Sequence, residues 1–238
     1  GRPGWHIECS AMSLKLLGER FDIHGGGTDL LFPHHEAEIF QSECCLGHEP
    51  VVQYWIHNGM INVDGEKMSK SLGNFWTIKD AIEQVDPLVL RYTMINAPYR
   101  QPIDFNQKML DESSVHHQRM VSVYGEVLSS FGITDWGGVD ILESTSKRFT
   151  AAMNDDFNTR NAVVEIQSVV NSLRSLLDNG ADADILAAGA GWLSEFAGDV
   201  LGLLPTDESI QEMMAEDESA RSEIESIVEP LLKERTEA

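Results

Sequence analysis

The order of elements near the start of the chain constrains its fold more than any other feature. We expect strands over residues 20–24 and 51–57 with a helix over residues 34–46 between them, and an earlier helix over residues 9–19. A helical crossover is the usual connection between two strands that pair in parallel. The sequence therefore predicts part of a parallel α/β sheet in its first quarter.

The later part of the chain carries only helical signals from Pro102 onward. A helix also begins at Asp86-Pro87 and runs to about Ile95, because proline suits the first turn of a helix. We expect the later helices over residues 106–131, 140–153, 159–178, 183–203 and 217–236. The predicted fold class is α/β followed by an all-α helical bundle.

A glycine-rich run follows the first expected strand. His24 precedes three glycines, and Asp29 stands at the start of the next segment. Gly26 and Gly27 allow the backbone to come close to a ligand because no Cβ atom intervenes. Asp29 can accept hydrogen bonds from ribose hydroxyls. This run therefore favours a nucleotide ligand.

Two lysines lie three residues apart in the run Lys67–Ser71, after a hairpin turn expected at Asp64-Gly65. Lysine is a mobile point charge, so Lys67 and Lys70 suit a loop that follows phosphates as they move. The small hydroxyls of Ser69 and Ser71 stand beside them. Taken alone, such a loop is an ordinary solvated turn. After the glycine-rich run, it favours charge stabilisation as pyrophosphate leaves a triphosphate.

His34 and Glu38 are four residues apart, so they lie on one face of a helix. Cys9 ends the separate run Trp5–Cys9, which could return to the same edge of the sheet. Cysteine, histidine and glutamate are all zinc ligands. Taken alone, such a histidine–glutamate pair is more often a surface pair, and a single cysteine is usually a small buried side chain. Both interpretations stay open on these residues alone.

Three longer runs match one known family. They are PGWHIECSAM (residues 3–12), HGGGTDLLFPHHE (residues 24–36) and KMSKSLGN (residues 67–74). These runs resemble motifs of the class I aminoacyl-tRNA synthetases. In their individual residues they resemble the cysteinyl-tRNA synthetase family. The resemblance is strong over about residues 1–105 and weaker afterwards, where MNDDFNT (residues 153–159) is its clearest match.

The resemblance implies a zinc site. Cys9, His34 and Glu38 match three of the four zinc ligands of that family, whereas the fourth, a cysteine nearer the family's N-terminus, has no counterpart. One Zn²⁺ per chain would select the substrate thiolate, since a serine hydroxyl is a poor zinc ligand. Trp5 and His24 would line the substrate pocket. The alternative for Trp5 is an ordinary core tryptophan.

The resemblance also implies ATP with Mg²⁺ as a substrate. Lys67 and Lys70 would be the catalytic cations. The ATP-binding residues would be Gly26, Gly27, Asp29, Lys67, Ser69, Lys70 and Ser71.

The resemblance implies four segments. Residues 1–62 would be the second half of a Rossmann-like parallel-sheet catalytic domain, and residues 63–105 the lysine loop with a region that contacts the tRNA stem. Residues 106–204 would form a helical bundle of the tRNA-binding type. Residues 205–238, with 11 acidic and 3 basic side chains, would begin a truncated C-terminal region.

The expected activity is cysteine–tRNA ligation, with tRNA(Cys), cysteine and ATP as partners. The first alternative is a cysteine ligase that acts on an aminosugar in mycothiol synthesis. The second is a noncatalytic module that binds tRNA or another partner. The sequence has no His-Ile-Gly-His type motif, so we expect an internal fragment that needs the N-terminal half of the catalytic domain as a partner and does not activate cysteine alone.

The composition is strongly acidic, with 17 basic and 39 acidic residues and a net charge of −22. A protein that binds RNA through its phosphates normally has a basic surface, so the negative net charge argues against membership of this family. One hypothesis is adaptation to high salt. A free energy of unfolding that does not rise from low to molar salt would exclude this hypothesis. Three cysteines, no long apolar run and no export signal predict a cytoplasmic protein without a membrane span.

Overall fold

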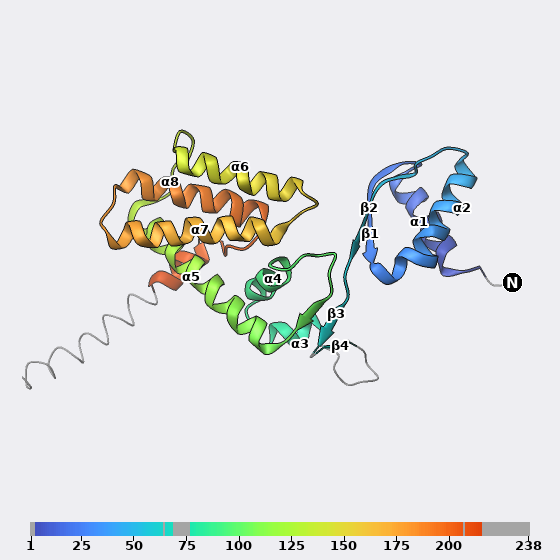
Figure 1. Cartoon of the computed structure of the whole chain (residues 1–238), viewed down its shortest axis with the longest axis horizontal. Helices are drawn as coiled ribbons and strands as arrows, with labels where there is room; N and C mark the ends of the chain where they lie inside the picture. Colours follow the sequence, from blue (N-terminus) through green and yellow to red (C-terminus); the bar gives the residue numbers. More distant parts are fainter. Residues whose placement is uncertain (1–2, 64, 69–76, 207, 216–238) are drawn as a thin grey trace, which may run out of the picture. The chain divides into compact units, whose positions relative to one another are not determined.

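The computed structural model describes residues 3–63, 65–68, 77–206 and 208–215, which fall into two compact units (Figure 1). The first, called the α/β unit below, comprises residues 1–77 and 97–106. The second, called the bundle unit, comprises residues 78–96 and 107–238. The chain therefore passes between the units more than once.

The α/β unit begins with a parallel pair of strands and two helices. Its elements are α1 (Trp5–Leu17), β1 (Phe21–Gly27), α2 (Glu36–Leu46) and β2 (Val52–Asn58). β1 and β2 pair in parallel, with Phe21 opposite Val52 and Gly27 opposite Asn58. Two short helical turns, Thr28–Leu30 and Leu31–His35, connect β1 to α2. The predicted α/β start is confirmed.

The two faces of the β1–β2 pair differ in chemistry, since successive side chains of a strand point to opposite faces. His24 pairs with Trp55, and Gly26 pairs with His57, so imidazole and indole rings share one face. The His24 and Trp55 rings stack with centroids 4.5 Å apart. Ile23 and Tyr54 pair on the other face, where they are 55% and 65% exposed.

A second, small sheet has the order β4-β3-β5 and consists of β3 (Ile61–Val63), β4 (Glu66–Lys67) and β5 (Ile103–Phe105). The antiparallel β3–β4 pair is the predicted hairpin. The prediction of helix alone after Pro102 is wrong at β5, which pairs in parallel with β3. Three residues are too few to show a strand period, and this strand depends on a partner 42 residues away in the sequence.

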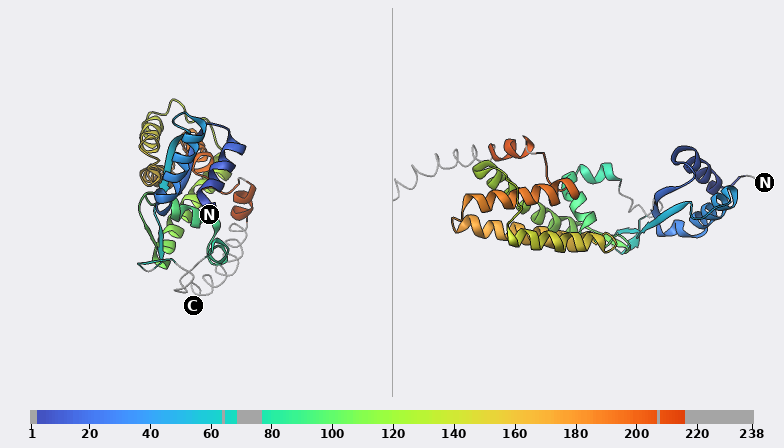
Figure 2. Two further views of the ribbon diagram at one scale, coloured as in Figure 1. Left: turned by 90° about the vertical axis from the view of Figure 1, so that its right-hand side faces the viewer. Right: turned by 90° about the horizontal axis from the view of Figure 1, so that it is seen from above.

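The bundle unit is helical. It contains α3 (Ile78–Ile82), α4 (Pro87–Ile95), α5 (Gln107–Phe131), α6 (Asp140–Asn154), α7 (Thr159–Asp178) and α8 (Ala183–Leu193). α6 and α7 run side by side (Figures 1 and 2). Carboxylate and amide side chains cap three helix starts: Asp86, Asn158 and Asp182 accept hydrogen bonds from backbone N–H groups two or three residues further along the chain.

One hydrophobic core fills the bundle unit. Trp192, Tyr92, Tyr124 and Ile166 are at most 1% exposed, and they belong to one cluster with side chains from α4, α5, α7 and α8. Trp192 donates a hydrogen bond from Nε1 to Oγ of Ser146 at 2.8 Å, so the polar atom of the buried indole is satisfied. The predicted all-α bundle after the α/β segment is confirmed.

Two expected helices differ from the structure. The single helix predicted over 183–203 is wrong beyond Leu193, because Ser194–Val200 adopts wider, π-helical turns. These turns end at Val200, and the positive φ of 64° at Gly202 lets Leu203 N–H bond to the Ala197 carbonyl. The helix expected over 217–236 lies outside the described residues. Within the part that the structure describes, no helix has the length and apolar character needed to span a bilayer.

Candidate functional site

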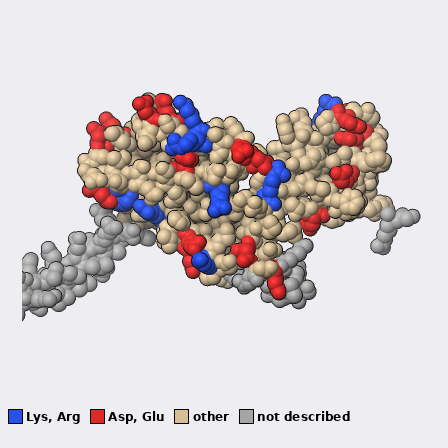
Figure 3. All heavy atoms as spheres, in the orientation of Figure 1, with Lys and Arg blue, Asp and Glu red and all other residues tan. Residues whose placement is uncertain are grey.

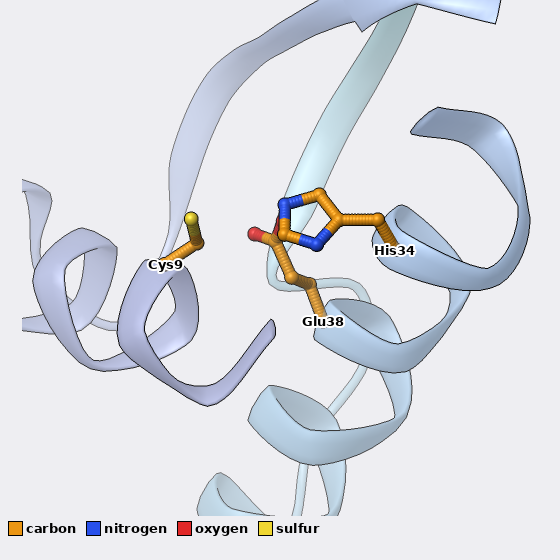
Figure 4. Close-up of side chains that lie close together, drawn as sticks. All are labelled: Cys9, His34 and Glu38. Carbon is orange, nitrogen blue, oxygen red and sulfur yellow. The ribbon is translucent and has the colours of Figure 1, made fainter. Parts of the chain in front are cut away.

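Three side chains that could hold a metal ion converge in the α/β unit. Cys9, His34 and Glu38 each place one donor atom within 4.8 Å of the others. Cys9 projects from α1, His34 from the turn that ends at His35, and Glu38 from the first turn of α2, and all three point toward one another (Figure 4). Cys9 therefore approaches from a helix, as expected for residues 9–19, although this helix begins earlier, at Trp5.

The geometry between His34 and Glu38 resembles two ligands that face a common point. Nε2 of His34 lies 2.8 Å from Oε1 of Glu38. Nevertheless, Oε1 has no aligned hydrogen-bond donor among the described residues, although both side chains are about 95% buried. A buried carboxylate oxygen without a hydrogen bond is costly. A cation between the thiol, the imidazole and the carboxylate would satisfy it, and this donor set suits zinc.

Burial favours the uncharged forms of these groups. It raises the pKa of Glu38 to about 6. Burial, with the nearby Glu38 carboxylate, raises the pKa of the Cys9 thiol. The pKa of His34 is lowered by burial and by His6. A bound divalent ion would reverse the effect on the two acids, because it stabilises their anionic forms.

Two aromatic side chains of α1 lie against His34. The rings of Trp5 and His34 have centroids 4.1 Å apart, and Nδ1 of His6 lies 2.5 Å from Nδ1 of His34. Trp5 is 57% exposed, so it is not a core residue of the described structure. Trp5 is therefore placed as a wall beside the metal-binding candidates.

A second group of rings lies on the other side of Glu38. His24 places Nε2 at 3.8 Å from Oε2 of Glu38. Nδ1 of His35 lies 2.7 Å from Nε2 of His57, and Trp55 stacks on His24 and lies tilted against His35. Burial lowers the pKa of His24 and lowers that of His35 to about 4, so these imidazoles are neutral at pH 7.

The glycine-rich run passes directly beside these rings. A Cβ atom on Gly26 would lie 2.7 Å from Cε1 of His35, and one on Gly27 would lie 2.5 Å from Oδ1 of Asp29. The buried His35 ring leaves no room for a side chain at Gly26, whereas a side chain at Gly27 would displace only the carboxylate end of Asp29. Lys67 lies in β4, whereas Ser69, Lys70 and Ser71 lie outside the described residues.

Comparison with known proteins identifies the family. Residues 1–115 match the family described as tRNA synthetases class I (C) catalytic domain, and residues 148–205 match the DALR domain. The chain belongs to the class I aminoacyl-tRNA synthetases. This synthetase chain is 42% identical to the cysteine–tRNA ligase of Geobacter sulfurreducens and 46% identical to that of Aromatoleum aromaticum.

These alignments cover 100% and 96% of the synthetase chain and 51% and 47% of the two relatives. The chain thus spans about half the length of the curated relatives that it matches. Among solved structures, an Agrobacterium radiobacter K84 LeuRS in complex with tRNA and LeuAMS has a TM-score of 0.63 at 20% identity, over 74% of this chain and 25% of that one. That similarity supports the class I synthetase fold.

Several residues around the site of this synthetase were not predicted in their observed roles. The side chains of His6 and His57 contact ring nitrogens of His34 and His35, and Trp55 stacks on His24. Alternation of His24 with Gly26 and of Trp55 with His57 along the two strands is the signal that could have revealed this shared face.

Proposed function

We propose that this chain forms part of a cysteine–tRNA ligase, which activates cysteine with ATP to cysteinyl-adenylate and transfers it to tRNA(Cys). The observation that carries the proposal is the convergence of Cys9, His34 and Glu38 within 4.8 Å, next to a glycine-rich loop. The names of the curated relatives point to the same activity.

The three donors would hold Zn²⁺, which supplies a coordination position for the substrate thiolate. Zinc favours sulfur over a hydroxyl, so cysteine would be selected against serine by a bond that serine cannot match. The chain's own residues set the shape of this pocket. The Trp5 ring covers His34 on one side, and His24 lies near Glu38 on the other.

The glycine-rich loop and the lysine loop would bind ATP with its Mg²⁺. Gly26 and Gly27 permit close approach of the backbone, and the Asp29 carboxylate would accept hydrogen bonds from the ribose. In this proposal Lys67 and Lys70 neutralise charge on the phosphates as pyrophosphate leaves, with Ser69 and Ser71 beside them.

The α/β unit has apolar surface for a further layer of the catalytic domain. Parallel sheets are normally covered on both faces, yet Ile23 and Tyr54 are more than half exposed. The longer relatives have additional chain that could supply this cover. We therefore propose the first half of the catalytic domain as a partner. The three free cysteines fit a reducing cytoplasm.

Binding of tRNA is assigned to the helical region by family membership and not by charge. On the face drawn in Figure 3, Lys and Arg side chains lie in separate groups among Asp and Glu. The net charge of −22 makes long-range attraction of RNA weak. Recognition would then depend on local contacts, and on chain contributed by the longer protein.

A chimaera tests the activity. This chain replaces the matching half of the Geobacter sulfurreducens ligase, and cysteine-dependent ATP–pyrophosphate exchange and charging of tRNA(Cys) are measured. We expect both activities, and loss of both in the Cys9→Ser and Glu38→Gln chimaeras. Cys44→Ser is the matched control, because Cys44 is an exposed free cysteine. The chain alone should stay at background.

Three outcomes would contradict the proposal. Activity of the Cys9→Ser chimaera equal to that of the parent would remove the metal site from the reaction. Transfer of cysteine to an aminosugar and not to tRNA would favour the mycothiol-type ligase. Binding of tRNA without any binding of ATP would favour a noncatalytic module.

A further inference from the structure

Glu38 faces two groups of metal-ligating side chains and not one. Its Oε1 atom lies 2.8 Å from Nε2 of His34, and its Oε2 atom lies 3.8 Å from Nε2 of His24. His24, His35 and Glu38 place their donor atoms within 4.8 Å of one another, as Cys9, His34 and Glu38 do. The Glu38 carboxylate is therefore shared by two triads, and it presents one oxygen to the other residues of each.

One histidine of the triad formed by His24, His35 and Glu38 is held in place by a neighbouring ring. Nδ1 of His35 is 2.7 Å from Nε2 of His57, so the other ring nitrogen of His35 is the one left for a ligand. Such a contact to the remote nitrogen is the usual way in which a ligating histidine is held. His35 and Glu38 are 3% and 4% exposed, and His24 is half-buried.

There is also room for one small ligand beside the triad. A cavity of about 10 Å³ is lined by His24 and Glu38, with Trp55 and Phe21 among its other walls. This volume is about that needed for one water molecule. A metal ion held by two imidazoles and one carboxylate needs such a further ligand to complete a tetrahedral shell.

We propose that His24, His35 and Glu38 form a second divalent-metal site, joined to the Cys9–His34 site through the Glu38 carboxylate. Two imidazoles and a carboxylate suit Zn²⁺, Co²⁺ or Ni²⁺. Sites that share a bridging group hold their ions about 3.5–4 Å apart. The Cys9 thiolate and the Glu38 carboxylate are the only anions of the two triads, so they do not neutralise two divalent ions. The second ion therefore binds on the order of 10-fold or more weakly than the first.

Titration of the untagged chain with Co²⁺ tests this site, because a thiolate ligand adds a charge-transfer band that nitrogen and oxygen ligands lack. We expect two equivalents: a tight one with the thiolate band and a weaker one that adds only ligand-field bands. His24→Asn and His35→Asn should each remove the second equivalent and leave the thiolate band. Cys9→Ser should abolish that band and keep an equivalent bound by nitrogen and oxygen.

Two further variants keep the test decisive. His57→Ala leaves all proposed ligands in place and should weaken the second equivalent about 10- to 100-fold through loss of orientation of His35. His116→Asn, at an exposed position of α5, is the matched control and should change nothing. Far-UV circular dichroism confirms that each variant is folded.

The proposal is overturned if the parent chain binds a single equivalent, or if the second equivalent persists in both histidine variants. Its failure is distinguishable from failure of the proposed ligase site. If the parent chain shows no thiolate band, Cys9 does not bind the metal ion and the proposed ligase site fails. The histidine triad is then tested separately, by the equivalent that has only nitrogen and oxygen ligands.

Discussion

In the bundle unit the most deeply buried side chains are Trp192, Met120 and Ile166, whereas in the α/β unit they include His34, His35 and Glu38. Large apolar side chains are exposed in both units, and Ile78 and Ile141 of the bundle unit are 76% and 70% exposed. Leu16, Phe32 and Phe40 of the α/β unit are 75%, 74% and 71% exposed. Burial of apolar surface stabilises a fold, whereas burial of ionisable groups costs free energy unless they are paired or ligated.

This difference separates stability from chemistry. The bundle unit has a continuous apolar core. In the proposed function, the α/β unit keeps costly buried groups together because they form a metal site, and the first half of the catalytic domain would cover its exposed apolar side chains. We therefore expect substitutions of the same residue type to change unfolding in one unit and ligand binding in the other.

The largest expected effect comes from a pair of tryptophans. Trp192→Ala should lower the free energy of unfolding of the bundle by about 3–5 kcal/mol, because it empties a fully buried site. Trp5→Ala should change it by about 0.5 kcal/mol or less, since Trp5 is half-exposed in the other unit. Urea unfolding followed by far-UV circular dichroism measures both. Equal losses would break the contrast between the units.

A pair of glycines should give the next largest effect. A Cβ atom at Gly191 would lie 2.0 Å from the carbonyl oxygen of Thr134, so Gly191→Ala should cost about 1–3 kcal/mol of bundle stability. Gly26→Ala meets the His35 ring and should instead weaken Co²⁺ binding while leaving the bundle unchanged. Gly25→Ala, with ordinary van der Waals space, is the control. Unaltered melting of Gly191→Ala would contradict the packing described.

A smaller effect should follow from the pH dependence of bundle stability. Burial lowers the pKa of His117, whose Nε2 donates to the Leu203 carbonyl at 2.8 Å. Below about pH 6.5 the unfolded chain binds a proton that the folded chain excludes, so stability falls as the pH drops and is unaffected above pH 7.5.

Urea unfolding of His117→Asn at pH 5 and pH 7.5 checks this origin. The variant is less stable at pH 7.5 but should lose less on acidification than the parent. His116→Asn, next to it on α5 and exposed, should follow the parent curve. An unchanged pH slope in His117→Asn would assign the acid sensitivity to other groups.

The smallest effect is expected at a surface ion pair of the bundle. Arg174 contacts Glu126 at 2.7 Å and Asp178 at 2.5 Å, and all three side chains are at least one-third exposed. Arg174→Ala should therefore cost at most about 1 kcal/mol, and less in 1 M salt. Denaturation at two salt concentrations measures it. A loss as large as that of Trp192→Ala would show that charge, and not the core, holds the bundle together.

Sequence patterns predicted local elements better than contacts between elements. The four-residue spacing of His34 and Glu38 and the Asp86-Pro87 helix start are local, and the structure has them where expected. The contact of His35 with His57 depends on β1–β2 register over more than twenty residues, which no local period specifies. The approach of Cys9 to His34 and Glu38 was expected from the family resemblance and not from any local period.

The pairing of β1 with β2 limits how this region of the protein can change. His24 stands opposite Trp55, and their neighbours Ile23 and Tyr54 stand opposite each other. An insertion or deletion of one residue inside either strand would put isoleucine or tyrosine into the pocket and turn the imidazoles outward. Within the strands, only changes of an even number of residues preserve the chemistry.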